Sequence, residues 1–308
     1  MSGVVAAFVA LVSVAVLGFV VGRAGVLRAQ DELVLSRLAF FVAMPALLFA
    51  TVSAADLRSV FSPVLLTNLA GVVVTQLVFV TVARFAWRRS RGEVTIGALA
   101  SSYINAGNLG IPVGVYVLGD GALVAPILLT QLLVITPAAF LLLDGGRRGA
   151  RRTSVREALL RPLRNPLTVA SLLGLAVAAT GTEVPAMLMR PVELVGGAAV
   201  PLALLAYGLS LSGSRPAAER GRRRELVLVV LLKNLVQPAV AYLAGRYVLG
   251  LDGTDLMTAT LFAALPTAQN IYVYAVHYDT ARPLARGAVL ATTVLSIPIM
   301  TAIVATLG

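Results

Sequence analysis

Two short polar segments lie inside otherwise apolar runs of the sequence, and they carry the residues best suited to bind a ligand. The first segment holds Asn105, Asn108, Gly110 and Pro112. The second segment holds Pro266, Gln269 and Asn270. Proline removes a helix hydrogen bond, glycine relaxes the backbone, and amides are costly in apolar surroundings unless they have partners. The two segments therefore predict two broken helices.

A broken helix offers an anion site where its second half begins, because the first N–H groups are free and carry partial positive charge. We expect these second halves to begin near Gly110 and near Ala268 and to lie close together. Two such N-termini would bind a carboxylate without an arginine. The donors that orient it would be Asn105, Asn108, Gln269 and Asn270. The alternative is two kinked helices whose amides only bond each other across a packed interface.

Lys233 is the only lysine among 25 basic residues, and it lies in the apolar stretch LLKNLVQPAV. A desolvated lysine can lose its proton, whereas arginine effectively cannot. Lys233 is therefore a candidate substrate counter-charge, proton carrier or stand-in for a coupling cation. The alternative is a lysine that extends its ammonium toward the membrane surface. The apolar runs carry no Asp or Glu at mid-depth, so a carboxylate-based proton relay is not expected.

Other polar residues in the runs favour structural roles. Gln76, Gln131 and Gln237 are single amides, which more often bond between helices than bind ligands. Ser210 lies in a GLSL stretch, and His277 is the only histidine that could act as its base. This pair leaves an intramembrane serine hydrolase open as an alternative, although so short a pattern is more typical of a hydroxyl at a helix end.

Composition indicates that the elements which position these residues are membrane helices. The 308 residues are 58% hydrophobic and only 13% charged, which suits hydrocarbon as a solvent. With no Cys and one His, neither a disulfide nor a transition-metal cofactor is expected. Ten apolar runs follow one another at about 3–22, 33–53, 63–86, 94–118, 121–143, 166–182, 187–212, 226–249, 255–278 and 284–307.

The arginines predict the orientation of these runs. Connections after the odd-numbered runs hold 20 basic residues, and those after the even-numbered runs hold three. Because basic loops stay in the cytoplasm, we expect Arg-rich cytoplasmic loops, both termini outside and a multi-pass protein of the plasma membrane. The net charge of +11 is thereby explained by topology, and nucleic acid is not an expected partner.

The two polar segments belong to a longer internal similarity. Pro45 and Pro201 lie in similar segments 156 residues apart, and Tyr116 and Tyr274 lie 158 residues apart. Two similar offsets predict a first five-helix repeat at 1–143, a cytoplasmic connecting loop at 144–165 and a second five-helix repeat at 166–308. An odd number of spans makes the two repeats inverted, which is a common transporter architecture.

Six ordered motifs resemble the auxin efflux carrier family, which includes bacterial permeases and the plant PIN-formed carriers. They read VAMPALLF, INAGNLGIPVGVYVLG, RNPLTVASLLGL, AAVPLALLAYG, LLKNLVQPAV and AALPTAQNIYVYA. The resemblance implies an all-α fold similar to bile-acid symporters and Na⁺/H⁺ antiporters, in which spans four and nine are broken and cross near their prolines. It also implies a substrate pocket at Asn105, Asn108, Pro112, Pro266 and Asn270, and small carboxylates or the auxin anion as substrates.

These observations together predict a secondary transporter that carries a small organic anion by alternating access, in contact with the lipid bilayer and without a cofactor. A passive anion channel is a further alternative. The sequence does not decide between H⁺ coupling, Na⁺ coupling and uniport. A homodimer is also compatible with it.

Overall fold

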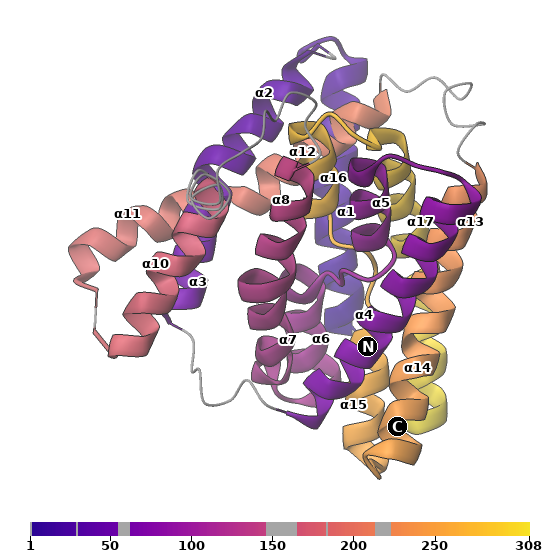
Figure 1. Ribbon diagram of the computed structural model, residues 1–308. Helices are drawn as coiled ribbons and strands as arrows, with labels where there is room; N and C mark the ends of the chain where they lie inside the picture. Colours follow the sequence, from indigo (N-terminus) through magenta and orange to yellow (C-terminus); the bar gives the residue numbers. More distant parts are fainter. Residues whose placement is uncertain (1, 29, 55–61, 146–164, 183, 213–222) are drawn as a thin grey trace.

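A computed structural model describes residues 2–28, 30–54, 62–145, 165–182, 184–212 and 223–308 (Figure 1). Every regular element within these ranges is a helix, and the one strand-like contact there is an isolated antiparallel bridge between Ile104 and Thr267. The all-α prediction is therefore confirmed for the described part of the chain. Most of the predicted connecting loop, 146–164, lies outside the described residues.

The helices follow the predicted apolar runs closely, and several contain a π-helical turn. In the first half they are α1 (Ser2–Arg23), α2 (Asp31–Leu38), α3 (Met44–Ser53), α4 (Pro63–Thr81), α5 (Arg91–Ala100), α6 (Ile111–Val113), α7 (Ala125–Thr130) and α8 (Thr136–Gly145). In the second half they are α10 (Pro166–Thr180), α11 (Ala186–Gly197), α12 (Ala199–Ser212), α13 (Arg223–Leu231), α14 (Gln237–Leu243), α15 (Gly253–Ala263), α16 (Asn270–His277) and α17 (Arg282–Leu307). The π-helical turns at Ala39–Ala43, Gln131–Ile135 and Leu232–Val236 join neighbouring helices into longer rods.

Six of the described helical rods are long and apolar enough to cross a membrane. They are Asp31–Ser53, Pro63–Ala86, Gly121–Asp144, Ala186–Ser212, Arg223–Val248 and Arg282–Leu307. Val12–Arg23, Ala106–Leu118 and Pro166–Thr180 are shorter apolar helices. The 15 residues of α10 fall below the roughly 20 that a perpendicular crossing needs. The ten-span inverted repeat stays a prediction.

The helices pack into two groups. A peripheral group contains α1, α2, α3, α10, α11 and α12, in which α1 packs along α12, and α3 packs against α10 and α11. A central group contains α4 to α8 and α13 to α17, in which α4 packs against α14, and α15 packs against α17. Helices α3, α10 and α11 lie on the left of Figure 1, and α13, α14, α15 and α17 lie on the right. Each group thus combines helices from both ends of the sequence.

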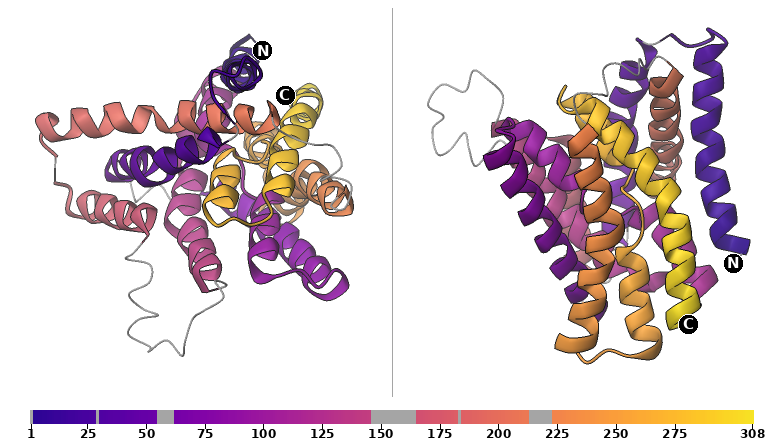
Figure 2. Two further views of the ribbon diagram at one scale, coloured as in Figure 1. Left: turned by 90° about the horizontal axis from the view of Figure 1, so that it is seen from above. Right: turned by 90° about the vertical axis from the view of Figure 1, so that its right-hand side faces the viewer.

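Small residues bring α1 and α12 into backbone contact. A Cβ atom on Gly208 would lie only 1.8 Å from the carbonyl oxygen of Ala15, and one on Gly18 would lie 2.5 Å from that of Leu205. Figure 2 shows α1 and α12 side by side at one flank of the molecule. Close approach at small residues is a common way for helices to associate in lipid, where no hydrophobic effect drives them together.

Candidate functional site

The two polar segments interrupt their helices and cross one another at the centre of the molecule. Helix α5 ends at Ala100 and helical structure resumes at Ala106, while α15 ends at Ala263 and α16 begins at Asn270. The Asn105 N–H donates to the Pro266 carbonyl at 2.8 Å, and the Ala268 N–H donates to the Tyr103 carbonyl at 3.1 Å. The two breaks therefore pair as a short antiparallel bridge. This confirms that both helices break.

The position of the first break differs from the prediction. Its second half begins at Ala106 and not near Gly110, because the extended pairing occupies the chain up to Asn105. Gly110 instead packs against the 3-10 turn Gly121–Val124 that precedes α7, where a Cβ would lie 2.7 Å from Val124. The second break is close to the prediction near Ala268, since α16 begins two residues later.

Side chains satisfy the carbonyl ends of the interrupted helices. The Thr267 hydroxyl donates to the Ala100 carbonyl at 2.6 Å, and the Gln237 amide donates to the Ser102 carbonyl at 3.0 Å. The Lys233 ammonium donates to the Ala263 carbonyl at 3.0 Å, where α15 ends. A cation at a helix C-terminus is stabilised by the partial negative charge there. Broken backbone is tolerated at this depth because protein groups bond it.

The N-terminal ends of the two second halves lack such caps. Asn105 and Gln269 are the residues in front of them, and neither side chain caps its helix. Instead the Asn105 amide donates to the Gln269 side-chain oxygen at 3.0 Å. The Ala106 N–H donates to the Ile104 carbonyl and the Ile271 N–H to the Ala268 carbonyl, so the N–H groups that an acceptor on a ligand can bond are the others of the first turns, such as that of Asn108.

A cavity of about 190 Å³ lies against the crossing, and we call it the crossover cavity. From the central group it is lined by Asn105, Asn108, Asn270, Tyr103, Gln131 and Tyr274, among others. From the peripheral group it is lined by Met44, Thr51, Leu167 and Ala199, among others. Three of the predicted amides thus meet in one cavity between the two groups.

Other predicted site residues lie outside the crossover cavity lining. Gln269 lines a second cavity of about 180 Å³, together with α1 and α12 residues. Pro266 contributes its carbonyl to the bridge, and Gly110 packs against Val124. Pro112 lies in α6, one residue after the cavity-lining Ile111. Pro266 therefore serves the crossing through its backbone, whereas Gln269 serves it through its side chain, which accepts the hydrogen bond from Asn105.

Lys233 is fully buried, with none of its surface exposed, so it does not reach the membrane surface. The structure contradicts the alternative of a snorkelling lysine, because the ammonium turns inward to the end of α15. Lys233 is not among the residues that line the crossover cavity. Its ammonium bonds the last carbonyl of α15 instead, where a positive charge stabilises the helix end.

The single amides behave as predicted. Gln76 donates to the Ser102 hydroxyl at 3.0 Å, Gln131 to the Ile104 carbonyl at 3.1 Å, and Gln237 to the Ser102 carbonyl. All three are interhelical hydrogen bonds to the first break. Gln131 also lines the crossover cavity, which its position in the sequence did not reveal.

Two tyrosines of the crossover cavity were not predicted. Tyr103 lies within the first break, and its hydroxyl shares a 3.0 Å hydrogen bond with the Thr136 hydroxyl. Tyr274 comes from α16, one turn after Asn270. In the sequence, aromatic residues within an apolar run cannot be told from ordinary packing residues. Only their proximity to the amides in the structure identifies them as cavity residues.

The contacts of Ser210 and His277 differ from those of a catalytic serine and its base, which bond each other. The Ser210 hydroxyl donates to the Tyr207 carbonyl at 2.6 Å, one turn back in its own helix. The His277 ring stacks on Phe40, with ring centroids 3.8 Å apart. These contacts are typical of a helix-end hydroxyl and a packed aromatic ring.

Comparison with known proteins identifies the family of this chain. The family model described as membrane transport protein matches residues 3–304. The "Putative malonate transporter" of Rhizobium meliloti (strain 1021) is 27% identical over 268 residues, covering 85% of this chain and 82% of the relative. An uncharacterized transporter of Methanothermobacter thermautotrophicus is 30% identical, covering 91% of each chain.

Plant proteins match over a shorter region. Auxin efflux carrier component 1 of Arabidopsis thaliana is 27% identical over 141 residues, which is 44% of this chain and 22% of the plant protein. All three relatives are named as transporters or carriers, and none as an enzyme. Because the family model spans nearly the whole chain, this protein belongs to the membrane transport protein family of the auxin efflux carriers.

Proposed function

We propose that this protein is a secondary transporter that moves a small organic anion across the plasma membrane by alternating access. The observation that carries the proposal is the crossover cavity, where two uncapped helix starts and three asparagines face one space. Helix N-termini and amide N–H groups favour a carboxylate, and they do so without a permanent side-chain charge.

The substrate class follows from the size and polarity of the cavity. Its volume of about 190 Å³ is more than ten times the roughly 10–15 Å³ that a cavity needs to hold one water molecule. That space suits a mono- or dicarboxylate of few carbons. Malonate, in the name of the Rhizobium relative, is such a dicarboxylate. In this proposal Asn108 and Asn270 donate to the carboxylate, and Asn105 positions the start of the helix.

The division of the helices into two groups supports the proposal of alternating access. Because the crossover cavity lies between the central and peripheral groups, a movement of one against the other would expose it to each side in turn. We propose that the Arg-rich loops are cytoplasmic and that both termini lie outside. In this proposal Lys233, which bonds the end of α15 outside the cavity lining, supplies a positive charge that is either permanent or lost on deprotonation.

Thermal stabilisation of the purified protein tests the site. A panel of mono- and dicarboxylates is added at pH 5.5 and 7.5, with and without Na⁺, because a ligand that binds the folded state raises the unfolding temperature. We expect one or a few carboxylates to stabilise the wild type and to lose this effect in Asn108→Ala and Asn270→Ala. The matched control is Asn234→Ala, which removes a buried amide that bonds the Thr292 carbonyl away from the cavity.

Stabilisation that persists in both cavity variants would overturn the site. Stabilisation only by cationic or uncharged compounds would overturn the substrate class. Counterflow in proteoliposomes separates a carrier from a channel, because a carrier exchanges labelled for unlabelled anion and saturates with substrate. Uptake that is linear in concentration would contradict alternating access.

A further inference from the structure

The crossover cavity has two walls of different chemistry. The central group contributes several amides, whereas the peripheral group contributes apolar side chains such as Met44, Leu48 and Leu167. Among the described residues with which the peripheral group lines the cavity, Thr51 on α3 is the only polar one. A ligand that fills the space between the two groups therefore meets amides on one side and a single hydroxyl on the other.

The Thr51 hydroxyl is available to a ligand. Thr51 is half-buried, and within the described part of the chain its hydroxyl makes no hydrogen bond. Buried threonines elsewhere, such as Thr67 and Thr75, bond a carbonyl of their own helix at 2.8 Å. The side chains of Asn108 and Asn270 on the opposite wall are also half-buried, and they too have no hydrogen-bond partner among the described residues. Polar groups with open bonding capacity therefore line this cavity from both groups of helices.

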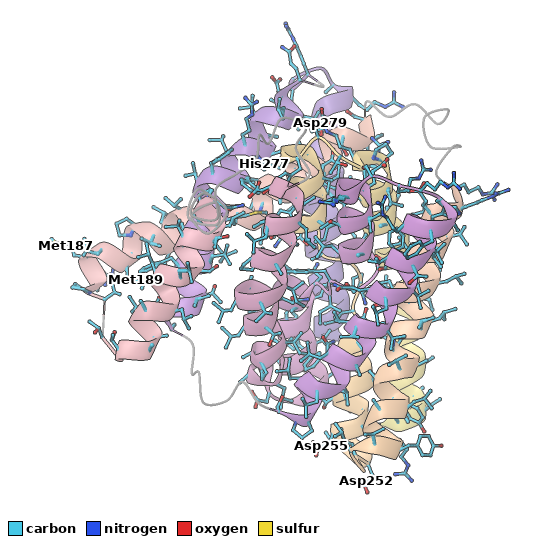
Figure 3. All side chains as sticks on the ribbon, in the orientation of Figure 1. Met187, Met189, Asp252, Asp255, His277 and Asp279 are labelled. Carbon is cyan, nitrogen blue, oxygen red and sulfur yellow. The ribbon has the colours of Figure 1, made fainter. Side chains whose placement is uncertain are left out.

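The lining of the crossover cavity is uncharged. None of the described residues that form it is Asp, Glu, Lys, Arg or His. In Figure 3 the labelled Asp252 and Asp255 lie at one end of the molecule and Asp279 lies at the other. Helix N-termini and amides on the central wall compensate one carboxylate. A second full charge would face the apolar wall, where an ion without a counter-charge is costly to bury, whereas an uncharged hydroxyl needs only one partner there.

We propose that Thr51 is a specificity-determining residue, whose hydroxyl bonds an uncharged hydroxyl at the end of the substrate remote from its carboxylate. The substrate is thereby a hydroxylated monocarboxylate of few carbons, in preference to an unsubstituted monocarboxylate or a dicarboxylate dianion. This inference rests on the proposed function, because it needs the carboxylate to bind at Asn108 and Asn270. Such a substrate bonds the central group at one end and the peripheral group at the other.

Two acids that differ by one hydroxyl test the proposal. 3-Hydroxypropionate carries at its far end a hydroxyl that propionate lacks. Their dissociation constants are measured by isothermal titration calorimetry on the purified full-length protein in detergent at pH 7.5. We expect the wild type to bind 3-hydroxypropionate about fivefold more tightly, which is the effect of one net hydrogen bond. Malonate, a dianion at this pH, should bind more weakly than 3-hydroxypropionate.

Substitutions at Thr51 assign the preference to its hydroxyl. Thr51→Val keeps the branched shape but not the hydroxyl, and it should bind the two acids within about twofold of each other. Its unfolding temperature without ligand should equal that of the wild type, because the hydroxyl has no partner to lose. Thr51→Ser keeps the hydroxyl and should keep the preference. The matched control is Thr301→Val, an exposed threonine on α17 outside the cavity lining, which should bind both acids as the wild type does.

Three results would overturn the role of Thr51: equal affinity of the wild type for the two acids, a preference that persists in Thr51→Val, or tighter binding of malonate than of 3-hydroxypropionate. In each case, propionate binding that is lost in Asn108→Ala would leave the carboxylate site and the proposed function standing. Absence of binding by all three acids would overturn the role of Thr51 as well. The wider carboxylate panel then decides whether the proposed function fails with it.

Discussion

At the residue scale, Lys233 combines a hydrogen bond and a charge that two substitutions can separate. Lys233→Gln keeps a donor for the Ala263 carbonyl but removes the charge, whereas Lys233→Met removes both. We expect Lys233→Met to lower the free energy of unfolding by about 1–3 kcal/mol, because a buried carbonyl loses its partner. Lys233→Gln should have nearly the same free energy of unfolding as the wild type. It should nevertheless lower the transport rate in proteoliposomes at least about tenfold, because about 1.4 kcal/mol of charge interaction is lost.

The two readouts test different statements about Lys233. Full transport by Lys233→Gln would mean that the charge is not required and that the residue serves only as a cap. Thermal unfolding of both variants in the same detergent supplies the stability comparison. Lys233→Arg is the charge-preserving control, because arginine keeps the positive charge but cannot give up its proton.

At the element scale, the contact between α1 and α12 depends on glycine. Gly208→Val would place a Cβ within 1.8 Å of the Ala15 carbonyl oxygen, so the helices must separate. We expect this overpacking to cost about 1–3 kcal/mol and to appear as a lower unfolding temperature. Gly197→Val is the matched control, because a Cβ there meets no atom within 4 Å. Equal unfolding temperatures for the two variants would contradict the close packing.

At the scale of the whole molecule, alternating access requires the two groups of helices to move against each other. Glu32 on α2 accepts a 2.5 Å hydrogen bond from the Tyr272 hydroxyl on α16, which joins the peripheral to the central group. The chain contains no cysteine, so pairs of introduced cysteines can be crosslinked specifically. Crosslinking the double variant Glu32→Cys, Tyr272→Cys with a short bifunctional thiol reagent should abolish transport, and reductant should restore it.

A pair within one group controls for the crosslink itself. Arg89 and Glu225 form a salt bridge between two segments of the central group. Crosslinking Arg89→Cys with Glu225→Cys should leave transport within about twofold of the reduced protein, since rocking would not change their separation. Transport that survives the first crosslink would contradict a movement between the groups.

The sequence by itself determined that the chain is helical and apolar, where most of its helices lie, and that two of them break. These features are local: proline and glycine interrupt a helix wherever they stand, and composition alone selects hydrocarbon as solvent. The structure alone decided that helical structure resumes at Ala106 after the first break and that Lys233 faces the end of α15. It also decided which residues meet in a cavity: Asn108 and Asn270 do, with Tyr103 and Tyr274, whereas Gln269 belongs to a second cavity. The physical reason is that break position, side-chain direction and cavity lining depend on contacts between different segments of the chain, such as the 3.0 Å bond from Asn105 to Gln269, 164 residues later. No local pattern in the chain encodes such contacts.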